Sequence, residues 1–296
     1  MGLFQVLKDF LYQMVVQSGV VYHVLMPLVH KLPQSIMFNT DKTYNHLVAD
    51  KEGKTFRVSK MDGRLYPPFG EDKLRSIKNI NVRESDVFLA GYPKTGAHWM
   101  YEIMTMLLTG TKEPSRYGKD AAFIDPMPDI VLDSLPSPRV LSGHLRYEEL
   151  PNGIYEKRTK IVYTVRNPKD TLVSFFNHHK NIQGYKFNGG FNGHFDLFME
   201  GNMDYGSYFD FVLDWDKLVK NPPSSNQILM VTFEEMKAEP EKSVKKVAEF
   251  LGVQVSDKDV EEIVQASSFS KLKAKRSNDV SAKLYRKGEL FFKKSV

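Results

Sequence analysis

The stretch Asp86-Val-Phe-Leu-Ala-Gly-Tyr-Pro-Lys-Thr-Gly-Ala-His-Trp99 decides the fold of this chain. Its first seven residues form a short apolar run typical of a buried strand, and the residues from Pro93 to Gly96 follow as a turn. Apolar residues then recur at three- and four-residue spacing from Trp99 to Leu107, and Gly110 follows as a helix stop. The stretch therefore predicts a strand, a turn and a helix in direct succession.

Two later segments have the same organisation. The β-rich run Lys160–Val165 leads into Asn167, a suitable helix N-cap, and Pro168, which suits the first turn of a helix. A third strand is predicted over Gln227–Phe233, before an amphipathic helix over Glu241–Leu251. Strands that alternate with helices predict an α/β protein, here a single domain with a central, mostly parallel sheet flanked by helices. In such sheets ligands bind beyond the carboxyl ends of the strands, where the turns of interest lie.

The composition of the 296 residues excludes several classes of protein. The chain has no cysteine, which rules out a disulfide framework, a Cys-ligated metal site and a thiol nucleophile, and which fits a cytoplasmic location. The net charge is +5, and the segment from Lys271 onward holds nine basic residues against two acidic ones. A basic tail on a near-neutral body indicates an anionic partner, such as a phosphorylated cofactor, nucleic acid or a membrane surface. A solvated surface stretch is the alternative.

The N-terminal region is apolar, because no Asp, Glu, Lys or Arg occurs over Phe10–Val29. A stretch of this length can span a bilayer as a helix, but its two glutamines and Pro27 make it a poor spanning segment. We expect one or two apolar helices over residues 3–30 that pack on the domain, on a second copy or on a membrane surface. We accordingly divide the chain into an apolar helical N-terminal extension, residues 1–40, and a main domain, residues 41–296.

The turn after the first strand has the composition of an anion site. The first amides of the following helix point outward, Gly96 lets the backbone approach a phosphate closely, Thr95 offers a hydroxyl and Lys94 offers a charge. It is not the P-loop signature, because the first glycine is missing and the lysine precedes Gly96. Phosphate binding is the favoured interpretation, and an ordinary strand–helix turn with a surface lysine is the alternative.

Several motifs together resemble the cytosolic sulfotransferases, which use 3′-phosphoadenosine 5′-phosphosulfate (PAPS). The stretch Tyr92–Trp99 resembles their 5′-phosphosulfate loop, Arg166–Ser174 resembles their 3′-phosphate segment, and Arg286-Lys287-Gly288 is similar to their late basic motif. Three more motifs follow the family's order along the chain: Pro138–Leu145, Asp204–Tyr208 and Ser267–Phe269. The resemblance covers about residues 60–290 and implies the sulfotransferase fold, which is related to that of the P-loop nucleotide kinases.

The resemblance also implies an activity and its residues. The activity is in-line transfer of a sulfuryl group from PAPS to a hydroxyl or amine of a small acceptor, which leaves 3′-phosphoadenosine 5′-phosphate (PAP). His144 would be the catalytic base, Lys94 would stabilise the bridging oxygen as the nucleotide leaves, and Ser174 would bridge Lys94 and the 3′-phosphate. Trp99 and Phe269 would enclose the adenine. The cofactor-binding residues implied in this way are Lys94, Thr95, Gly96, Ala97, His98, Trp99, Arg166, Ser174, Tyr205, Ser267, Phe269, Arg286, Lys287 and Gly288.

Other partners follow from the same resemblance. The candidates for an acceptor pocket are Tyr66, Phe69, Phe123 and His178, and the acceptor is a small molecule rather than nucleic acid. No metal is needed, and no cluster of His, Asp and Glu in the sequence has metal-ligand spacing. We expect a cytoplasmic protein with peripheral membrane contact through residues 3–30.

The chain departs from the family pattern at four places, and the first is a stretch of about 40 additional residues before the part that resembles the family. Ala97 removes a hydroxyl from the phosphosulfate loop, and Ser142 stands where many members carry a lysine that assists the transferring group. After Gly288 the chain lacks the usual continuation with its dimer motif. Two alternatives therefore stay open: a catalytically impaired protein that binds PAPS or PAP, and a P-loop-like kinase of small molecules.

Overall fold

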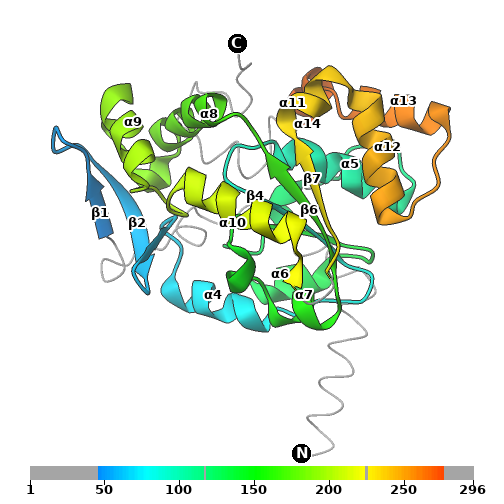
Figure 1. Ribbon diagram of the computed structural model, residues 1–296, viewed down its shortest axis with the longest axis horizontal. Helices are drawn as coiled ribbons and strands as arrows, with labels where there is room; N and C mark the ends of the chain where they lie inside the picture. The colour runs from blue at the N-terminus through cyan, green and yellow to red at the C-terminus, as the bar shows by residue number, and fades with distance from the viewer. Residues whose placement is uncertain (1–45, 117, 224–225, 277–296) are drawn as a thin grey trace, which may run out of the picture.

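Two separate β-sheets organise the computed structural model, which describes residues 46–116, 118–223 and 226–276. The central sheet has four parallel strands in the order β5-β4-β6-β7, with strands that lie far apart in the chain side by side (Figure 1). The predicted parallel sheet of an α/β domain is therefore confirmed. Its strands are β4 (Val87–Gly91), β5 (Val140–Gly143), β6 (Lys160–Val165) and β7 (Ile228–Thr232).

Helices α5, α10, α11 and α12 pack against this sheet. Because β4 is buried at every position and β6 at four of six, these strands read as nearly continuous apolar runs in the sequence. In Figure 1 helix α10 crosses in front of the sheet, whereas α5 packs against β4 and β5. The helices are α4 (Glu71–Ser76), α5 (Ala97–Thr109), α6 (Asp129–Ser134), α7 (Asn152–Glu156), α8 (Pro168–Asn181), α9 (Phe191–Glu200), α10 (Tyr208–Lys220), α11 (Phe233–Ala238), α12 (Pro240–Leu251), α13 (Asp257–Ala266) and α14 (Phe269–Arg276).

The helix ends follow the signals in the sequence. The Asn167 side chain caps α8 by accepting a hydrogen bond from the Lys169 amide at 2.9 Å, and Pro168 lies in the first turn. Helices α5 and α12 end at Gly110 and Gly252, both in the left-handed conformation that glycine adopts without steric cost. These features confirm the predicted strand–turn–helix units.

A second sheet, antiparallel and three-stranded, was not foreseen from the sequence. It consists of β1 (His46–Ala49), β2 (Thr55–Met61) and β3 (Arg64–Tyr66). Its inner face is held by Phe56 and Val58, which are fully buried. The Phe56 ring lies 6.0 Å from that of Phe187 in an edge-to-face pair. This small sheet is tied to the main domain by side-chain packing and forms one wall of the cavity described below.

The turn between β4 and α5 is anchored in the core by Tyr92, which follows β4 and is fully buried. Its hydroxyl donates a hydrogen bond to the Gly206 carbonyl at 2.8 Å. Its ring makes edge-to-face contacts with Phe175, Tyr208 and Phe211. Because these three rings come from α8 and α10, the turn cannot move without disturbing two helices.

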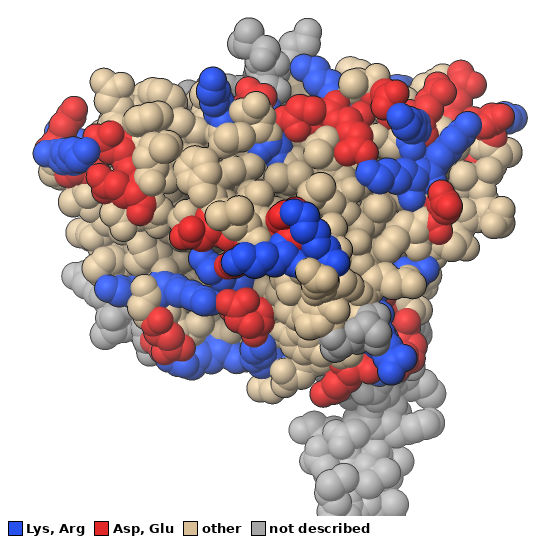
Figure 2. All heavy atoms as spheres, viewed as in Figure 1, with Lys and Arg blue, Asp and Glu red and all other residues tan. Residues whose placement is uncertain are grey.

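The predictions for residues 1–40, the apolar segment 3–30 included, lie outside the described residues. Within the described part, no helix is long and apolar enough to cross a membrane. The face of the molecule in Figure 2 carries basic and acidic side chains interspersed with each other.

Candidate active site

The turn between β4 and α5 is a tight, left-handed structure. Lys94 has φ of 73° and Gly96 has φ of 100°, and a Cβ atom on Gly96 would lie 2.9 Å from the Phe233 ring. Thr95 is fully buried, donates a hydrogen bond to the Tyr92 carbonyl at 2.7 Å and lies 3.1 Å from the Thr164 hydroxyl. The threonine therefore holds the turn from inside. The first amides of α5 follow this turn, and amides at a helix N-terminus attract anions.

Arg166 follows β6 and comes to the same edge of the sheet. It is buried, and its guanidinium lies 4.2 Å above the ring of Phe233. Its contacts to protein oxygens are long: Nη1 lies 3.4 Å from the Lys94 carbonyl and Nη2 lies 4.0 Å from the Asp170 carboxylate. Its Nε is buried, with no acceptor among the residues that the structure describes. A planar cation held in this way fits a phosphate group.

Lys94 is a destabilised cation. Burial, followed by the nearby charges of Arg166 and Lys119, lowers its pKa to about 8. Because like charges gather here, the site attracts an anion such as a phosphate or a sulfate ester.

His144 follows β5 and is held in one tautomer. Its Nδ1 lies 2.6 Å from the carbonyl oxygen of Gly91, the last residue of β4. A carbonyl oxygen only accepts, so Nδ1 carries the proton and Nε2 keeps a free lone pair. Burial lowers the pKa of His144 well below 6.5, and the charges of Lys119 and Lys94 lower it further. The imidazole is therefore neutral at pH 7, as a general base must be.

An acidic and a phenolic group support the histidine. The main-chain N–H of His144 donates to Asp125 at 3.2 Å, and the Tyr205 hydroxyl donates to the same carboxylate oxygen at 2.6 Å. The ring of Tyr205 lies 5.6 Å from the imidazole, and the ring of Phe123 lies 5.1 Å from it. Burial raises the pKa of Asp125 to about 6. Tyr205, expected among the cofactor-binding residues, thus lies beside His144.

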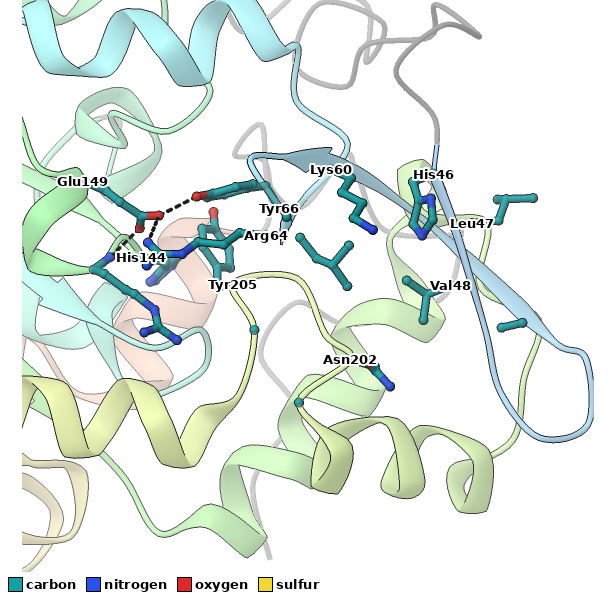
Figure 3. A pocket seen from close by; sticks show the side chains of 16 residues that line it. His46, Leu47, Val48, Lys60, Arg64, Tyr66, His144, Glu149, Asn202 and Tyr205 are labelled. Carbon is teal, nitrogen blue, oxygen red and sulfur yellow. Dashed lines mark hydrogen bonds and ion pairs between the residues drawn. The ribbon is translucent and has the colours of Figure 1, made fainter.

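A cavity of 410 Å³ opens from His144. Figure 3 shows Tyr66, Glu149 and Tyr205 around the imidazole, with His46 from β1 toward the opposite end. The Tyr66 hydroxyl donates to Glu149 at 2.5 Å, and Arg64 donates to the same oxygen at 2.7 Å. The cavity wall is therefore partly apolar and partly a hydrogen-bonded polar network, which suits a small organic molecule with one polar end.

The four candidates for an acceptor pocket are found at different places. Tyr66 lines the cavity. The Phe69 ring packs edge-to-face on Phe123 at 6.3 Å, so this pair supports His144 from the side. His178 is half-buried on α8, and its pKa is lowered well below 6.5 by burial and then by the charge of Lys94.

The structure describes most, but not all, of the residues expected around the nucleotide. Trp99 packs on Phe233, with ring centroids 5.8 Å apart, and its Nε1 is buried with no acceptor among the described residues. Ser174 is half-buried on α8. Ser267 is buried at the end of α13, a helix that packs on α5, and Phe269 begins α14 with 42% of its surface exposed. Arg286, Lys287 and Gly288 lie outside the described residues.

Three residues of the site were missed from the sequence: Phe233, Asp125 and Lys119. Phe233 follows β7 directly, so the rule that ligands lie beyond the carboxyl ends of strands was the signal that could have found it. Lys119 begins a short 3-10 helix before β5 and Asp125 follows that helix, and no local sequence pattern marks either residue. Within the described residues, no cluster of His, Asp and Glu could hold a metal ion.

Comparisons with known proteins show the family to which this chain is similar. The family model described as the sulfotransferase domain matches residues 84–296. Human sulfotransferase 6B1 is 31% identical over 225 residues, which cover 74% of this chain and 73% of that protein. Mouse sulfotransferase 1A1 is 30% identical over 212 residues, covering 68% and 72%. The crystal structure of mouse sulfotransferase SULT7A1 complexed with PAP is similar with a TM-score of 0.62 and 33% identity, covering 73% of this chain and 76% of that one.

Proposed function

Because the chain belongs to the sulfotransferase family, we propose that it transfers a sulfuryl group from PAPS to a hydroxyl or amine of a small organic acceptor, with His144 as the base. One observation carries the proposal. The imidazole directs its Nδ1 proton to the Gly91 carbonyl, lines the 410 Å³ cavity and lies within electrostatic reach of Lys119 and Lys94. A base between a donor site and an acceptor site is what group transfer requires.

The cations fit the donor. Lys94 and the amides from Thr95 to Trp99 would hold the 5′ end, and Arg166 with Ser174 would hold the 3′-phosphate. The support is the orphaned Nε of Arg166, its long contacts to protein oxygens and the lowered pKa of Lys94. We assign the late motif Arg286-Lys287-Gly288 to the same phosphate on resemblance alone. When bound, PAPS supplies a sulfuryl group activated by its link to a phosphate.

The remaining chemistry belongs to the chain's own groups. His144 Nε2 accepts the proton of the acceptor hydroxyl as the acceptor oxygen forms a bond to sulfur. The bond between sulfur and the bridging phosphate oxygen breaks, and its electron pair stays on that oxygen of PAP. Lys94 stabilises the negative charge that develops there. The Tyr205–Asp125 pair and the Gly91 carbonyl keep the imidazole in place during the transfer.

The first test is a thermal-shift titration with PAP, compared with 5′-AMP. A ligand at 100 times its dissociation constant raises stability by about 2.7 kcal/mol, a shift of several degrees. We expect a large shift with PAP, a small one with 5′-AMP, and loss of the difference in Arg166→Ala. Arg75→Ala is the control, because Arg75 forms exposed ion pairs with Asp62 and Glu71.

The second test is turnover with PAPS and a panel of phenols, alcohols, steroids and amines. Sulfated product that depends on His144 supports the proposal. Tight PAP binding with no product from any acceptor would instead support the impaired binding protein. Absence of both PAP binding and product in a folded protein would overturn the proposed function.

A further inference from the structure

Lys119 is a buried lysine beside His144. It begins the 3-10 helix η3 (Lys119–Ala122) and keeps only 3% of its surface exposed. Its ammonium lies 3.7 Å from the centre of the Phe123 ring, and that ring makes an edge-to-face contact with His144. Among the residues that the structure describes, none forms a hydrogen bond or an ion pair with Lys119. A buried cation held only by a ring face is costly unless an anion joins it.

The segment that carries Lys119 is registered against the strand that leads to His144. Phe123 forms a parallel bridge with Ser142 of β5, and the Ile124 amide donates to the Ser142 carbonyl at 2.9 Å. His144 follows Ser142 by two residues. Lys119 is therefore anchored through the backbone next to the proposed base, rather than placed there by a flexible loop.

The charged groups around Lys119 also favour the binding of an anion. Burial lowers its pKa to about 8, although Asp120 and Asp125 oppose the shift. Its charge in turn lowers the pKa values of both Lys94 and His144. Lys119, Lys94 and His144 are thus within electrostatic reach of one another. Lys119 forms no ion pair with a carboxylate among the described residues, and its printed contact is with the face of the Phe123 ring, so the arrangement leaves room for an incoming negative group.

We propose that Lys119 is a catalytic residue whose ammonium contacts the oxygens of the sulfuryl group as that group passes from PAPS to the acceptor at His144. The inference rests on the proposed function and deepens it. Lys119 keeps its proton throughout and forms no covalent bond. It stabilises the negative charge spread over the sulfuryl oxygens, as preorganised cations do in phosphoryl transfer.

The test compares Lys119→Met, Lys119→Gln and Lys119→Arg. We expect the two neutral variants to lower kcat about 100-fold, the effect of losing one charge-stabilising donor, and Lys119→Arg to stay within about 10-fold of the parent. The affinity for PAP should change less than about twofold, because PAP lacks the sulfuryl group. The melting temperature of the ligand-free protein should be unchanged or higher, since an unpaired buried charge has been removed.

Lys160→Met is the matched control. The Lys160 ammonium also lies over a phenyl ring, 5.8 Å from the centre of Phe250, but it begins β6 and donates to the Phe250 carbonyl. This variant should keep the parent kcat. It separates loss of a lysine–aromatic contact in general from loss of the one beside His144.

A rescue variant makes the test sharper. Ser142 and His144 lie two residues apart at the end of a strand, where such side chains share a face. The Ser142 hydroxyl donates to the Ala122 carbonyl at 3.3 Å, in the same short helix as Lys119. Lys119→Met combined with Ser142→Lys should therefore recover about 10-fold or more of the lost kcat, because it returns an ammonium to this side of His144.

The possible outcomes distinguish a failure of the proposed role of Lys119 from a failure of the proposed sulfuryl-transfer function. A parent protein that neither binds PAP nor makes product overturns the proposed function and this inference together. An active parent with kcat for Lys119→Met and Lys119→Gln within threefold of its own overturns the inference alone. So does a loss of PAP affinity or of melting temperature that matches the loss of kcat, because Lys119 would then be structural.

Discussion

The Nδ1 atom of His144 lies 2.6 Å from the carbonyl oxygen of Gly91, and this contact joins two neighbouring strands of the central sheet at their carboxyl ends. The contact orients the imidazole and fixes its tautomer. It also requires a residue without a side chain at position 91, because a Cβ there would lie 2.4 Å from the Thr164 hydroxyl. The geometry of the base thus depends on a glycine in the adjacent strand.

Replacing His144 by Ala should lower kcat by about 10²- to 10⁴-fold, the contribution of a positioned general base. Binding of PAP, measured by thermal shift, should be retained. Arg75→Ala is the control, since Arg75 forms exposed ion pairs with Asp62 and Glu71 and should leave kcat within about threefold. A His144→Ala enzyme with parental kcat would contradict the assignment of the base.

Replacing Phe233 by Leu should weaken PAP binding about 10-fold. The ring supports the Arg166 guanidinium at 4.2 Å and packs on Trp99, and a cation–π contact at a partly buried site contributes about 1 kcal/mol or more. Calorimetric titration measures the change. Phe250→Leu is the matched control, because that ring meets Lys160 on another part of the sheet. Equal PAP affinities for the two variants would contradict a role of Phe233 in PAP binding.

The value of kcat/KM for PAPS should fall above about pH 8, because it reports the free enzyme. Lys94 and Lys119 both have pKa values lowered to about 8, and each loses its positive charge above that pH. On the acid side the decline should begin only below pH 6.5, because the pKa of His144 lies well below that value. A profile that stays flat through pH 9.5 would contradict the assignment of these lysines to the donor.

The stability of the ligand-free protein should rise between pH 7.5 and 9.5. In this range the unfolded lysines hold protons that the folded ones release, so the free energy of unfolding increases with pH. For Lys119 the rise is about 2 kcal/mol over this range, from a folded pKa of about 8 and an ordinary value of 10.5. Urea titrations measure it. Lys119→Met should remove about half of the slope, and an unchanged slope would show that this lysine is not destabilised by burial.

Replacing Asp204 by Asn should lower the free energy of unfolding by about 3 kcal/mol. Asp204 is fully buried and accepts hydrogen bonds from His179 at 2.7 Å and from the Tyr185 hydroxyl at 2.6 Å. Asp196→Asn is the control, because Asp196 forms only an exposed pair with Lys51 and should change stability by less than about 1 kcal/mol. Equal urea midpoints for the two variants would contradict a structural role for the buried group.

Three strands of the central sheet could be predicted, and the clearest of them, β4 and β6, are buried along almost their whole length and therefore form apolar runs in the sequence. The run Lys160–Val165 matches β6 residue for residue, and the cap at Asn167 is as predicted. The small sheet β1–β3 was missed, because an antiparallel strand with one solvent-facing side shows only alternation. In β2 that alternation rests on Phe56 and Val58, too few apolar residues to distinguish a strand from irregular chain.

Some residues of the candidate site could be predicted from the sequence, and others could not. The composition of the turn after the first strand indicated Lys94, whereas His144 and Arg166 were indicated by the resemblance to the family's motifs. Lys119 looks like a surface lysine in the sequence, and only the packing of η3 against β5 makes it a buried cation. Arg64 and Glu149 meet across 85 positions of the chain, and no local pattern reports such a pairing.

The two sheets have a consequence for how the specificity of this protein can change. The strands that end at the donor groups belong to the parallel sheet, whereas β1, β2 and β3 supply much of the cavity wall and have no backbone ladder with that sheet. Substitutions along residues 46–66 can therefore reshape the cavity without shifting the strand ends that hold Lys94 and Arg166. Substitutions that favour a new acceptor can therefore accumulate in the small antiparallel sheet, while the groups proposed for sulfuryl transfer stay on the parallel sheet. For the same reason, residues 46–66 are the segment to exchange between relatives when the acceptor preference is to be changed.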